Sequence, residues 1–204
     1  MIIEVPPPYK NEHLHFGFAQ VGWQLGQYRA LRRRVFCDEQ RLFVGTDEDE
    51  LDRRATPIVA VASCMGAPDQ VVGVVRIDER TPGVWYGGRL GVAPDYRRTA
   101  RFTITGLFDG GQPVGPFDTS VGAALIYKAV STAKARGARR FLANVQAQNV
   151  PFFERMHWKV LFEENLFGLP HARMAADLAH YPAARLAPPP NLLAPAFHLP
   201  MRLL

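Results

Sequence analysis

The chain has 204 residues, which is enough for one domain with a sizeable hydrophobic core and too few for two ordinary domains. Hydrophobic residues make up 48% of it and charged residues 21%, proportions that exclude an intrinsically disordered protein. The sequence has no apolar run that could span a membrane, no secretory signal at its start, and only two cysteines. We therefore expect a cytoplasmic protein with no membrane partner and no disulfide framework.

The formal net charge of +5 favours an anionic partner, such as a phosphorylated cofactor or an acidic small molecule. Nucleic acid is not an expected partner, because the acidic stretch TDEDELD at 46–52 follows the arginines at 29–34 and would offset their charge. No metal ion is expected either, since the six histidines lack the spacing of metal ligands.

Hydrophobic periodicity predicts the order βα, three strands, then αβαββ. The first predicted elements are a strand at 15–22, a helix at 23–36, and strands at 57–65, 70–79 and 83–93. After them we predict a long helix at 120–136, a strand at 139–147, a short helix at 149–156, and strands at 158–164 and 170–178. Asp118 or Thr119 is expected to cap the long helix.

Two segments interrupt this pattern. Residues 99–119 are rich in glycine, proline and aspartate, which predicts an irregular loop, and a small hairpin at FTITGLF is compatible with this pattern. Residues 183–204 form a proline-rich extension that packs either along the domain or on a second copy of the chain. A single domain is therefore expected over residues 1–182.

The stretch NVPFFERMHW at 149–158 has the features of a helix start. The side chain of Asn149 can accept hydrogen bonds from the unpaired amides of the first turn, where Pro151 needs no partner. A purely structural cap and a cap that also contacts a ligand are both compatible with this pattern, because the two roles do not compete.

The segments LGVAPDYRR at 90–98 and SVGAAL at 120–125 have the features of a diphosphate site. The start of a helix presents unpaired amides and the positive end of the peptide dipoles, and small side chains let a ligand approach the backbone. Arg97 and Arg98 add cationic groups that bind phosphate through charge-assisted hydrogen bonds.

Residues 25–180 resemble the GNAT acyltransferases, which bind acyl-CoA through an Arg/Gln-x-x-Gly-x-Gly/Ala stretch after the fourth strand. The matching segments are GRLGVAPDYRR (88–98), SVGAALIYKAV (120–130) and RGARRFLANVQAQNVPFFERMHW (136–158). The chain looks closest to an uncharacterised GNAT-like branch whose members stand alone or precede another enzyme domain. LRRRVFCDEQRLFVGTDEDELD (31–52) is also loosely similar to acyl-homoserine-lactone synthases.

This resemblance implies an α/β fold of the α+β type, with a mixed, mostly antiparallel sheet of about seven strands and helices on both faces. It implies acetyl-CoA or another acyl-CoA as co-substrate, without a metal. The residues implied in cofactor binding are Leu90, Gly91 and Val92 for pantetheine, Arg97, Arg98, Ser120, Val121, Gly122 and Ala123 for pyrophosphate, and Asn149 and Phe153 beside the pantetheine arm. The amide of Val92 would also polarise the thioester carbonyl.

The chain departs from the GNAT pattern at its phosphate loop and at its proton-transfer groups. Ser120 occupies the place of the first glycine, and residues 99–119 interrupt the loop. Phe153 replaces a tyrosine that protonates the leaving thiolate in many GNAT enzymes, and phenylalanine cannot donate a proton. The fourth strand, VWYGGRLGV, has no carboxylate. Tyr86, Asp78 and Glu39 remain as candidate catalytic residues.

The favoured interpretation is an N-acyltransferase, most simply an N-acetyltransferase, acting on the amine of a small molecule. One alternative is a GNAT-like binding or accessory domain that has lost acyl transfer and works with a partner enzyme, since fold does not fix function. Another is a synthase-like use of a carrier-protein thioester. A homodimer is compatible with each of these interpretations.

Overall fold

The computed structural model describes residues 11–107 and 114–184. Apart from residues 183 and 184, the predicted C-terminal extension lies outside the described residues. None of the helices in the described part is long and apolar enough to cross a membrane.

One mixed sheet of nine strands runs through the described residues, in the order β6-β5-β1-β2-β3-β4-β7-β9-β8. Its pairs are antiparallel except for β1 with β5 and β4 with β7. The strands are β1 (His13–Phe18), β2 (Thr56–Cys64), β3 (Ala67–Thr81), β4 (Val84–Val92), β5 (Ala100–Thr105), β6 (Val114–Thr119), β7 (Arg140–Gln146), β8 (Trp158–Leu166) and β9 (Leu169–Ala176).

Within residues 11–107 and 114–184, three α-helices accompany the sheet, together with several short helical turns. The α-helices are α1 (Gly22–Arg33), α2 (Val121–Ala135) and α3 (Val150–Arg155). The turns are the π-helical η1 (Arg34–Glu39), which continues α1, and the 3₁₀ segments η2 (Glu50–Arg53), η3 (Pro94–Tyr96), η4 (Ala147–Asn149) and η5 (Leu178–His180).

All the predicted elements occur in the predicted order, but two further strands, β5 and β6, lie between β4 and α2. The α+β fold with its mixed, mostly antiparallel sheet is confirmed. The sheet has nine strands rather than about seven, because the described parts of the segment at 99–119 form strands β5 and β6 instead of an irregular loop. Phe102 and Ile104 alternate with more exposed residues and are each 1% exposed, which is the pattern of a half-buried strand. Strand β5 pairs with β1 and β6, so the described parts of this segment extend the sheet beyond β1.

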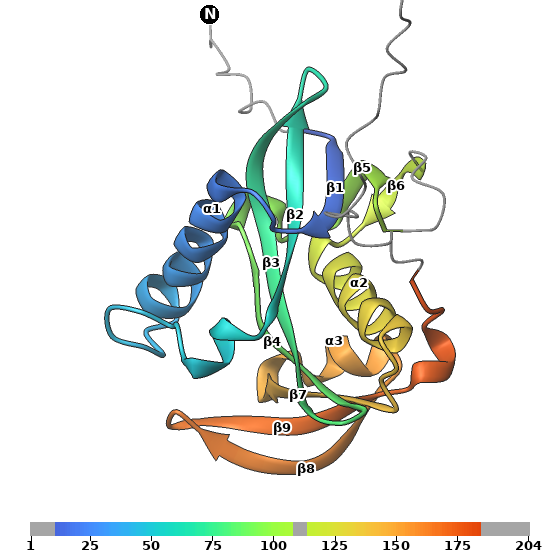
Figure 1. Cartoon of the computed structure of the whole chain (residues 1–204). Helices are drawn as coiled ribbons and strands as arrows, with labels where there is room; N and C mark the ends of the chain where they lie inside the picture. Colours follow the sequence, from blue (N-terminus) through green and yellow to red (C-terminus); the bar gives the residue numbers. More distant parts are fainter. Residues whose placement is uncertain (1–10, 108–113, 185–204) are drawn as a thin grey trace, which may run out of the picture.

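Helices cover both faces of the central strands (Figure 1), with α1 on one side of β2 to β4 and α2 on the other. Glycines in the strands allow this close packing. A Cβ atom at Gly73 would lie 2.8 Å from Leu125 and 2.9 Å from Val121 of α2. A Cβ atom at Gly91 would lie 3.4 Å from Val35. The α2 helix is therefore seated directly on β3, with its first turn beside the end of β4.

Strands β4 and β7 separate halfway along β4. Their parallel pairing joins Val84–Gly87 to Arg140–Ala143 and does not continue to Val92. Where the pairing stops, the register between β3 and β4 shifts, and Arg89 has a φ of 54°. A left-handed residue in a shifted register is typical of a β-bulge, which bends a strand and redirects its side chains. The bulge therefore accompanies an opening in the middle of the sheet.

Candidate functional site

A cavity of about 340 Å³ lies at the opening between β4 and β7. Ile126 and Ala129 of α2 line it from one face of the sheet, while Asp49 and Arg76 line it from the other. The cavity therefore reaches both faces of the sheet through the opening.

The wall on the α2 side is apolar and aromatic. It is formed by Ile126, Ala129, Phe141, Phe153 and Trp158. The rings of Phe153 and Trp158 meet edge to face with centroids 5.1 Å apart, and Phe141 contacts Trp158 in the same way at 5.7 Å. These contacts make Phe153 part of the core and of the cavity wall at once. Its packing in the core therefore does not exclude the expected contact with a ligand.

The opposite wall is polar, and Tyr86 lies at its centre. Its ring lies under the guanidinium of Arg80, whose central carbon is 3.8 Å from the ring centroid. Its hydroxyl oxygen accepts a hydrogen bond from Nη1 of Arg173 at 3.2 Å. Arg173 also pairs with Glu164 at 3.2 Å. Strands β3, β8 and β9 thus contribute charged side chains around the phenol ring of Tyr86 on β4.

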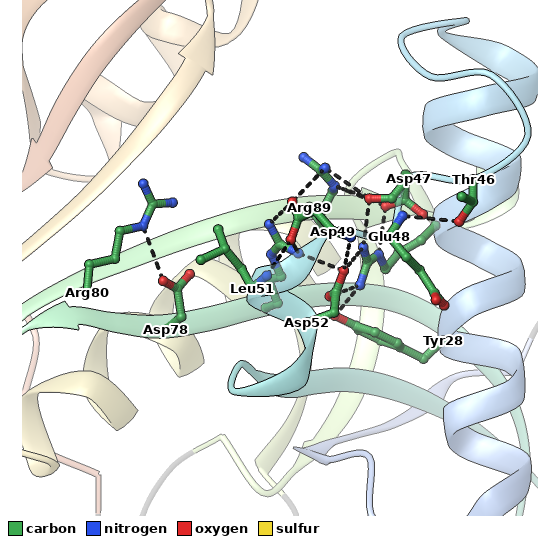
Figure 2. Close-up of polar contacts among 12 residues, drawn as sticks. Tyr28, Thr46, Asp47, Glu48, Asp49, Leu51, Asp52, Asp78, Arg80 and Arg89 are labelled. Carbon is green, nitrogen blue, oxygen red and sulfur yellow. Dashed lines mark hydrogen bonds and ion pairs between the residues drawn. The ribbon is translucent and has the colours of Figure 1, made fainter.

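A network of three aspartates and three arginines borders this wall (Figure 2). Arg32, 1% exposed, reaches Asp47 at 2.8 Å and Asp52 at 2.5 Å. The remaining pairs are Arg76 with Asp49 at 2.7 Å and with Asp52 at 2.8 Å, and Arg89 with Asp47 at 3.0 Å and with Asp49 at 3.2 Å. Each aspartate therefore pairs with two arginines.

The arginines of the network lower the pKa values of Asp49 and Asp52. Burial opposes the ionisation of Asp52, but hydrogen bonds from Arg32, Arg76 and the backbone of Asp49 outweigh it and hold the pKa of Asp52 well below its usual range. The pKa of Asp49 is lowered in the same way, against the effect of burial, chiefly by Arg76. Both carboxylates are thus charged at neutral pH.

This network fixes the acidic segment at 46–52 over the sheet. Because buried charges are stable only when they are paired, removal of one partner would leave an uncompensated ion. The expected offset of the helix arginines is confirmed for Arg32, which bonds to Asp47 and Asp52, and for Arg29, which pairs with Glu48 at 3.1 Å. The network also carries Leu51 into the cavity wall.

The candidate catalytic residues do not meet at one point. Tyr86 lines the cavity. Asp78 lies opposite Tyr86 in the β3–β4 register but is only 2% exposed, and it accepts from Nε of Arg80 at 3.2 Å. Glu39 ends η1 and pairs with Arg34 at 3.4 Å and with Arg97. Of the three, only Tyr86 is among the residues that line the cavity.

The residues of β4 that are expected to bind pantetheine lie along the edge of the opening. Leu90 lines the cavity, and Gly91 packs against Val35. The amide of Ala93 donates to the carbonyl of Val72 on β3 at 2.8 Å. Because successive amides of a strand point to opposite sides, the N–H of Val92 points away from β3, toward the side where β7 has separated.

The first turn of α2 lies beside this edge. A Cβ atom at Gly122 would be 3.9 Å from Val92 and 3.9 Å from Phe152 of α3, ordinary contact distances. The helix cap is Ser120 rather than Asp118 or Thr119, because the Ser120 side chain accepts from the amide of Ala123 at 3.5 Å. Val121 is fully buried, so it can offer a ligand only its backbone.

The two arginines expected at the pyrophosphate differ in their surroundings. Arg97 donates from Nε to the carbonyl of Val92 at 2.9 Å, and its terminal nitrogen pairs with Glu39. Arg98 is exposed. Arg97 is therefore held at the end of β4, whereas Arg98 extends into solvent.

Asn149 precedes α3 at the cap position, and Pro151 lies in the first turn as expected, but the Asn149 side chain makes no capping hydrogen bond. The expectation of a side-chain cap is therefore wrong. The residue has helical backbone angles instead of the extended ones that a capping side chain requires, because η4 leads directly into α3. Asn149 is exposed and lines the cavity, which leaves its amide available to a ligand.

His171 of β9 is a further cavity residue with a defined hydrogen-bond role. Its Nδ1 lies 2.8 Å from the carbonyl oxygen of Leu169. Because a carbonyl only accepts, Nδ1 carries the proton, and Nε2 of the neutral ring is left with a lone pair. No described residue bonds to Nε2. This arrangement suits a group that takes a proton from a ligand.

Sequence reasoning missed several members of the site, chiefly Arg76, Arg80, Arg89 and Arg173. Each lies on a strand that was identified correctly, but the partners of Arg76, Arg89 and Arg173 are distant in the chain. A charged residue inside an apolar strand, such as Arg76 in QVVGVVRIDE, is the one signal that pointed to a buried partner. In the described residues, no cluster of histidine, cysteine and acidic side chains could hold a metal ion.

Comparison with models of protein families gives no match, and neither does comparison with curated proteins. Solved structures do match. A protein of Lactobacillus plantarum assigned as an N-acetyltransferase aligns with a TM-score of 0.61 and 18% identity, over 80% of this chain and 97% of its own. A protein of Desulfovibrio desulfuricans assigned to the GNAT family of acetyltransferases aligns with a TM-score of 0.54 and 13% identity, over 81% and 99%.

The acyl-homoserine lactone synthase BjaI also aligns, with a TM-score of 0.56 and 16% identity over 81% of this chain and 82% of its own. That protein is described as CoA-dependent, and its structure contains SAM and isopentyl-CoA. At these identities the likeness establishes the fold alone. The chain has a GNAT-like fold, which it shares with N-acetyltransferases and acyl-homoserine lactone synthases.

Proposed function

We propose that the protein transfers an acyl group, most simply acetyl, from CoA to the amine of a small molecule. The observation that carries this proposal is the cavity at the opening between β4 and β7, because the first turn of α2 lies at the edge of the same opening. A thioester carrier with a diphosphate needs a helix start for its anionic end and a groove for its extended arm. Both features adjoin Val92.

The binding roles follow from this placement. The backbone amides of the first turn of α2 would bind the pyrophosphate, with added charge from Arg97 and Arg98. The N–H of Val92 would donate to the thioester carbonyl and stabilise the negative charge that develops on its oxygen. Asn149 and Phe153 would contact the arm from the side of α3.

Acyl transfer requires that the amine lose a proton as it attacks the thioester carbon. His171 is the best placed acceptor, because its Nδ1–H is bonded to Leu169 and its Nε2 has no described partner. The nitrogen–carbon bond forms, the carbon–sulfur bond breaks, and CoA leaves as a thiolate that takes up a proton from solvent. Asp78 is less suitable as the base, because it is buried and bonded to Arg80.

The primary test combines cofactor binding with turnover. Calorimetry with acetyl-CoA and CoA is expected to give saturable binding, and thiol release in the presence of a panel of amines is expected to exceed the hydrolysis rate. Absence of binding at millimolar cofactor would reject the proposal. Binding without transfer to any amine would instead support an accessory domain that retains only the cofactor site.

The role of His171 has a more specific test. His171→Gln is expected to lower kcat by about a hundredfold or more with little change in KM for acetyl-CoA, as for loss of a general base. Added imidazole is expected to restore part of the rate. His180→Gln is a matched control, because His180 is a half-exposed histidine that pairs with Asp177 and does not line the cavity. An unchanged kcat in His171→Gln would assign proton removal to another group.

A further inference from the structure

Arg80 is held in place at the polar wall of the cavity by two contacts. Its Nε donates to Oδ2 of Asp78 at 3.2 Å, and its guanidinium carbon lies 3.8 Å from the centroid of the Tyr86 ring. Asp78 is 2% exposed, so the carboxylate that orients Arg80 is buried beneath it. Figure 2 shows this pair apart from the aspartate network, with Leu51 between the two. The plane of the guanidinium is thus fixed, and one of its donors is used.

The terminal nitrogens of Arg80 remain available. Among the described residues, Asp78 is its only hydrogen-bond partner, through Nε alone. The Arg80 side chain is 40% exposed and lines the cavity. Arginine presents its Nη1 and Nη2 donors in a fixed fork that matches the two oxygens of a carboxylate. An arginine whose Nε is hydrogen-bonded and whose guanidinium stacks on an aromatic ring keeps its terminal nitrogens for such a ligand.

In contrast to Arg80, the acidic side chain that lines the cavity already has its hydrogen-bond partners. Asp49 is the only acidic residue among those that line it, and its oxygens already accept from Arg76 and Arg89. Arg173, which donates to the Tyr86 hydroxyl, places a second guanidinium carbon 5.5 Å from the ring centroid. Arg80 is therefore the charged group at this wall whose hydrogen-bond donors remain unused among the described residues, and its positive charge favours a ligand that carries negative charge.

We propose that Arg80 binds the carboxylate of the acceptor, so that the amine acylated by this protein is an amino acid or a related amino carboxylate. This inference rests on the proposed acyl transfer, because that reaction defines the acceptor. Tyr86 supports Arg80 through its ring face, and Asp78 acts as a positioning residue that keeps the guanidinium flat on the ring. The acceptor amine then enters the same cavity that His171 lines.

The test compares acceptors that carry either a carboxylate or a neutral amide at the same position. Phenylalanine is paired with phenylalaninamide, and 5-aminopentanoate with 5-aminopentanamide, in a thiol-release assay with acetyl-CoA. We expect the carboxylate member of at least one pair to have a kcat/KM at least tenfold higher, since a charged hydrogen-bonded contact is worth about tenfold to a hundredfold. Equal use of carboxylates and amides would overturn the inference and leave the acyl transfer intact.

Variants of Arg80 assign the preference to that residue. Arg80→Gln is expected to abolish the preference for the carboxylate, and Arg80→Lys to keep part of it, because lysine retains the charge without the fork. Arg53→Gln is the control, since Arg53 is 81% exposed in its ion pair with Glu50 and does not line the cavity. A preference that survives in Arg80→Gln would overturn the assignment.

A binding measurement separates failure of the inference from failure of acyl transfer. Saturation-transfer NMR with the same ligand pairs needs no turnover. Binding of the carboxylates to wild type and to Arg53→Gln, with loss in Arg80→Gln, would support the inference even if no amine is acylated. Equal signals for carboxylates and amides, or no signal for either, would overturn it. Circular dichroism of Arg80→Gln and Arg80→Lys verifies that both variants are folded.

Discussion

Nε of Arg97 donates to the carbonyl oxygen of Val92 at 2.9 Å, so a residue expected to bind phosphate also holds the end of the strand that borders the opening. The other end of its guanidinium pairs with Glu39. Arg97 therefore connects η1 to the last residue of β4, next to the first turn of α2. A phosphate bound at that turn would meet a guanidinium that is already oriented.

This relationship predicts different effects for two neighbouring arginines. Arg97→Gln is expected to raise the Kd for CoA by about tenfold, because it removes a charge that is already oriented and frees the end of β4. Arg98→Gln removes an exposed, flexible charge and is expected to raise it by only about threefold. Calorimetry on both variants gives the comparison. Equal losses would show that the two arginines act only through net charge.

Gly122 tests whether a ligand approaches the backbone of α2. Its added Cβ would meet Ser120, Phe152 and Val92 at 3.7 to 3.9 Å, so Gly122→Ala should fold normally. We nevertheless expect about a tenfold loss of CoA affinity, because the methyl group would occupy space that a phosphate needs near the amides.

Gly26→Ala is the matched control for Gly122→Ala. A Cβ at Gly26 would meet nothing within 4 Å, and the position lies in the middle of α1. This variant is expected to gain about 1 kcal/mol in unfolding free energy from helix propensity, with no change in CoA binding. Unchanged CoA affinity in both variants would place the phosphates elsewhere.

Gly73 tests the seating of α2 on the sheet. A Cβ there would lie 2.8 Å from Leu125, 2.9 Å from Val121 and 3.2 Å from Ala60, all buried side chains. Gly73→Ala is therefore expected to lower the free energy of unfolding by about 1 to 3 kcal/mol through overpacking. Urea unfolding measures the change. A variant as stable as wild type would mean that α2 can move away from β3 at little cost.

The aspartate network predicts acid sensitivity. The folded pKa of Asp52 is lowered, so its contribution to stability is present above its unfolded pKa of about 3.9 and is lost as the pH falls toward the folded value. Asp49 adds a smaller effect of the same sign, screened by solvent because it is 37% exposed. The free energy of unfolding is therefore expected to decrease from about pH 5 downward.

Asp52→Asn separates this effect from general acid denaturation. The variant is expected to lose on the order of 3 kcal/mol at neutral pH, because it leaves the buried Arg32 with one anionic partner fewer. Its stability should then fall less steeply below pH 5 than that of wild type. Glu50→Gln is the control, because Glu50 is 82% exposed. Parallel pH curves for Asp52→Asn and wild type would contradict the assignment.

Most helices and strands of this fold are predicted by patterns in the local sequence. The continuous apolar run in PIVAVASCM and the helical spacing in SVGAALIYKAV depend on residues a few positions apart, and they predicted β2 and α2 to within a few residues. The segment at 99–119 was the exception. Its glycines and prolines concealed two strands that exist because β1 offers β5 a free edge, and that edge is a tertiary feature.

The sequence by itself determined the relative order of the predicted strands and helices and the apolar faces that pack together. It also predicts phosphate binding at the end of β4 and the start of α2, and that part stays a prediction. Only the tertiary structure decided where β4 and β7 separate, that Arg97 is bound to Val92, and that Tyr86 contacts both Arg80 and Arg173. The reason is the separation of the partners along the chain. Tyr86 and Arg173 are 87 positions apart, and no local pattern encodes a charged contact over that separation.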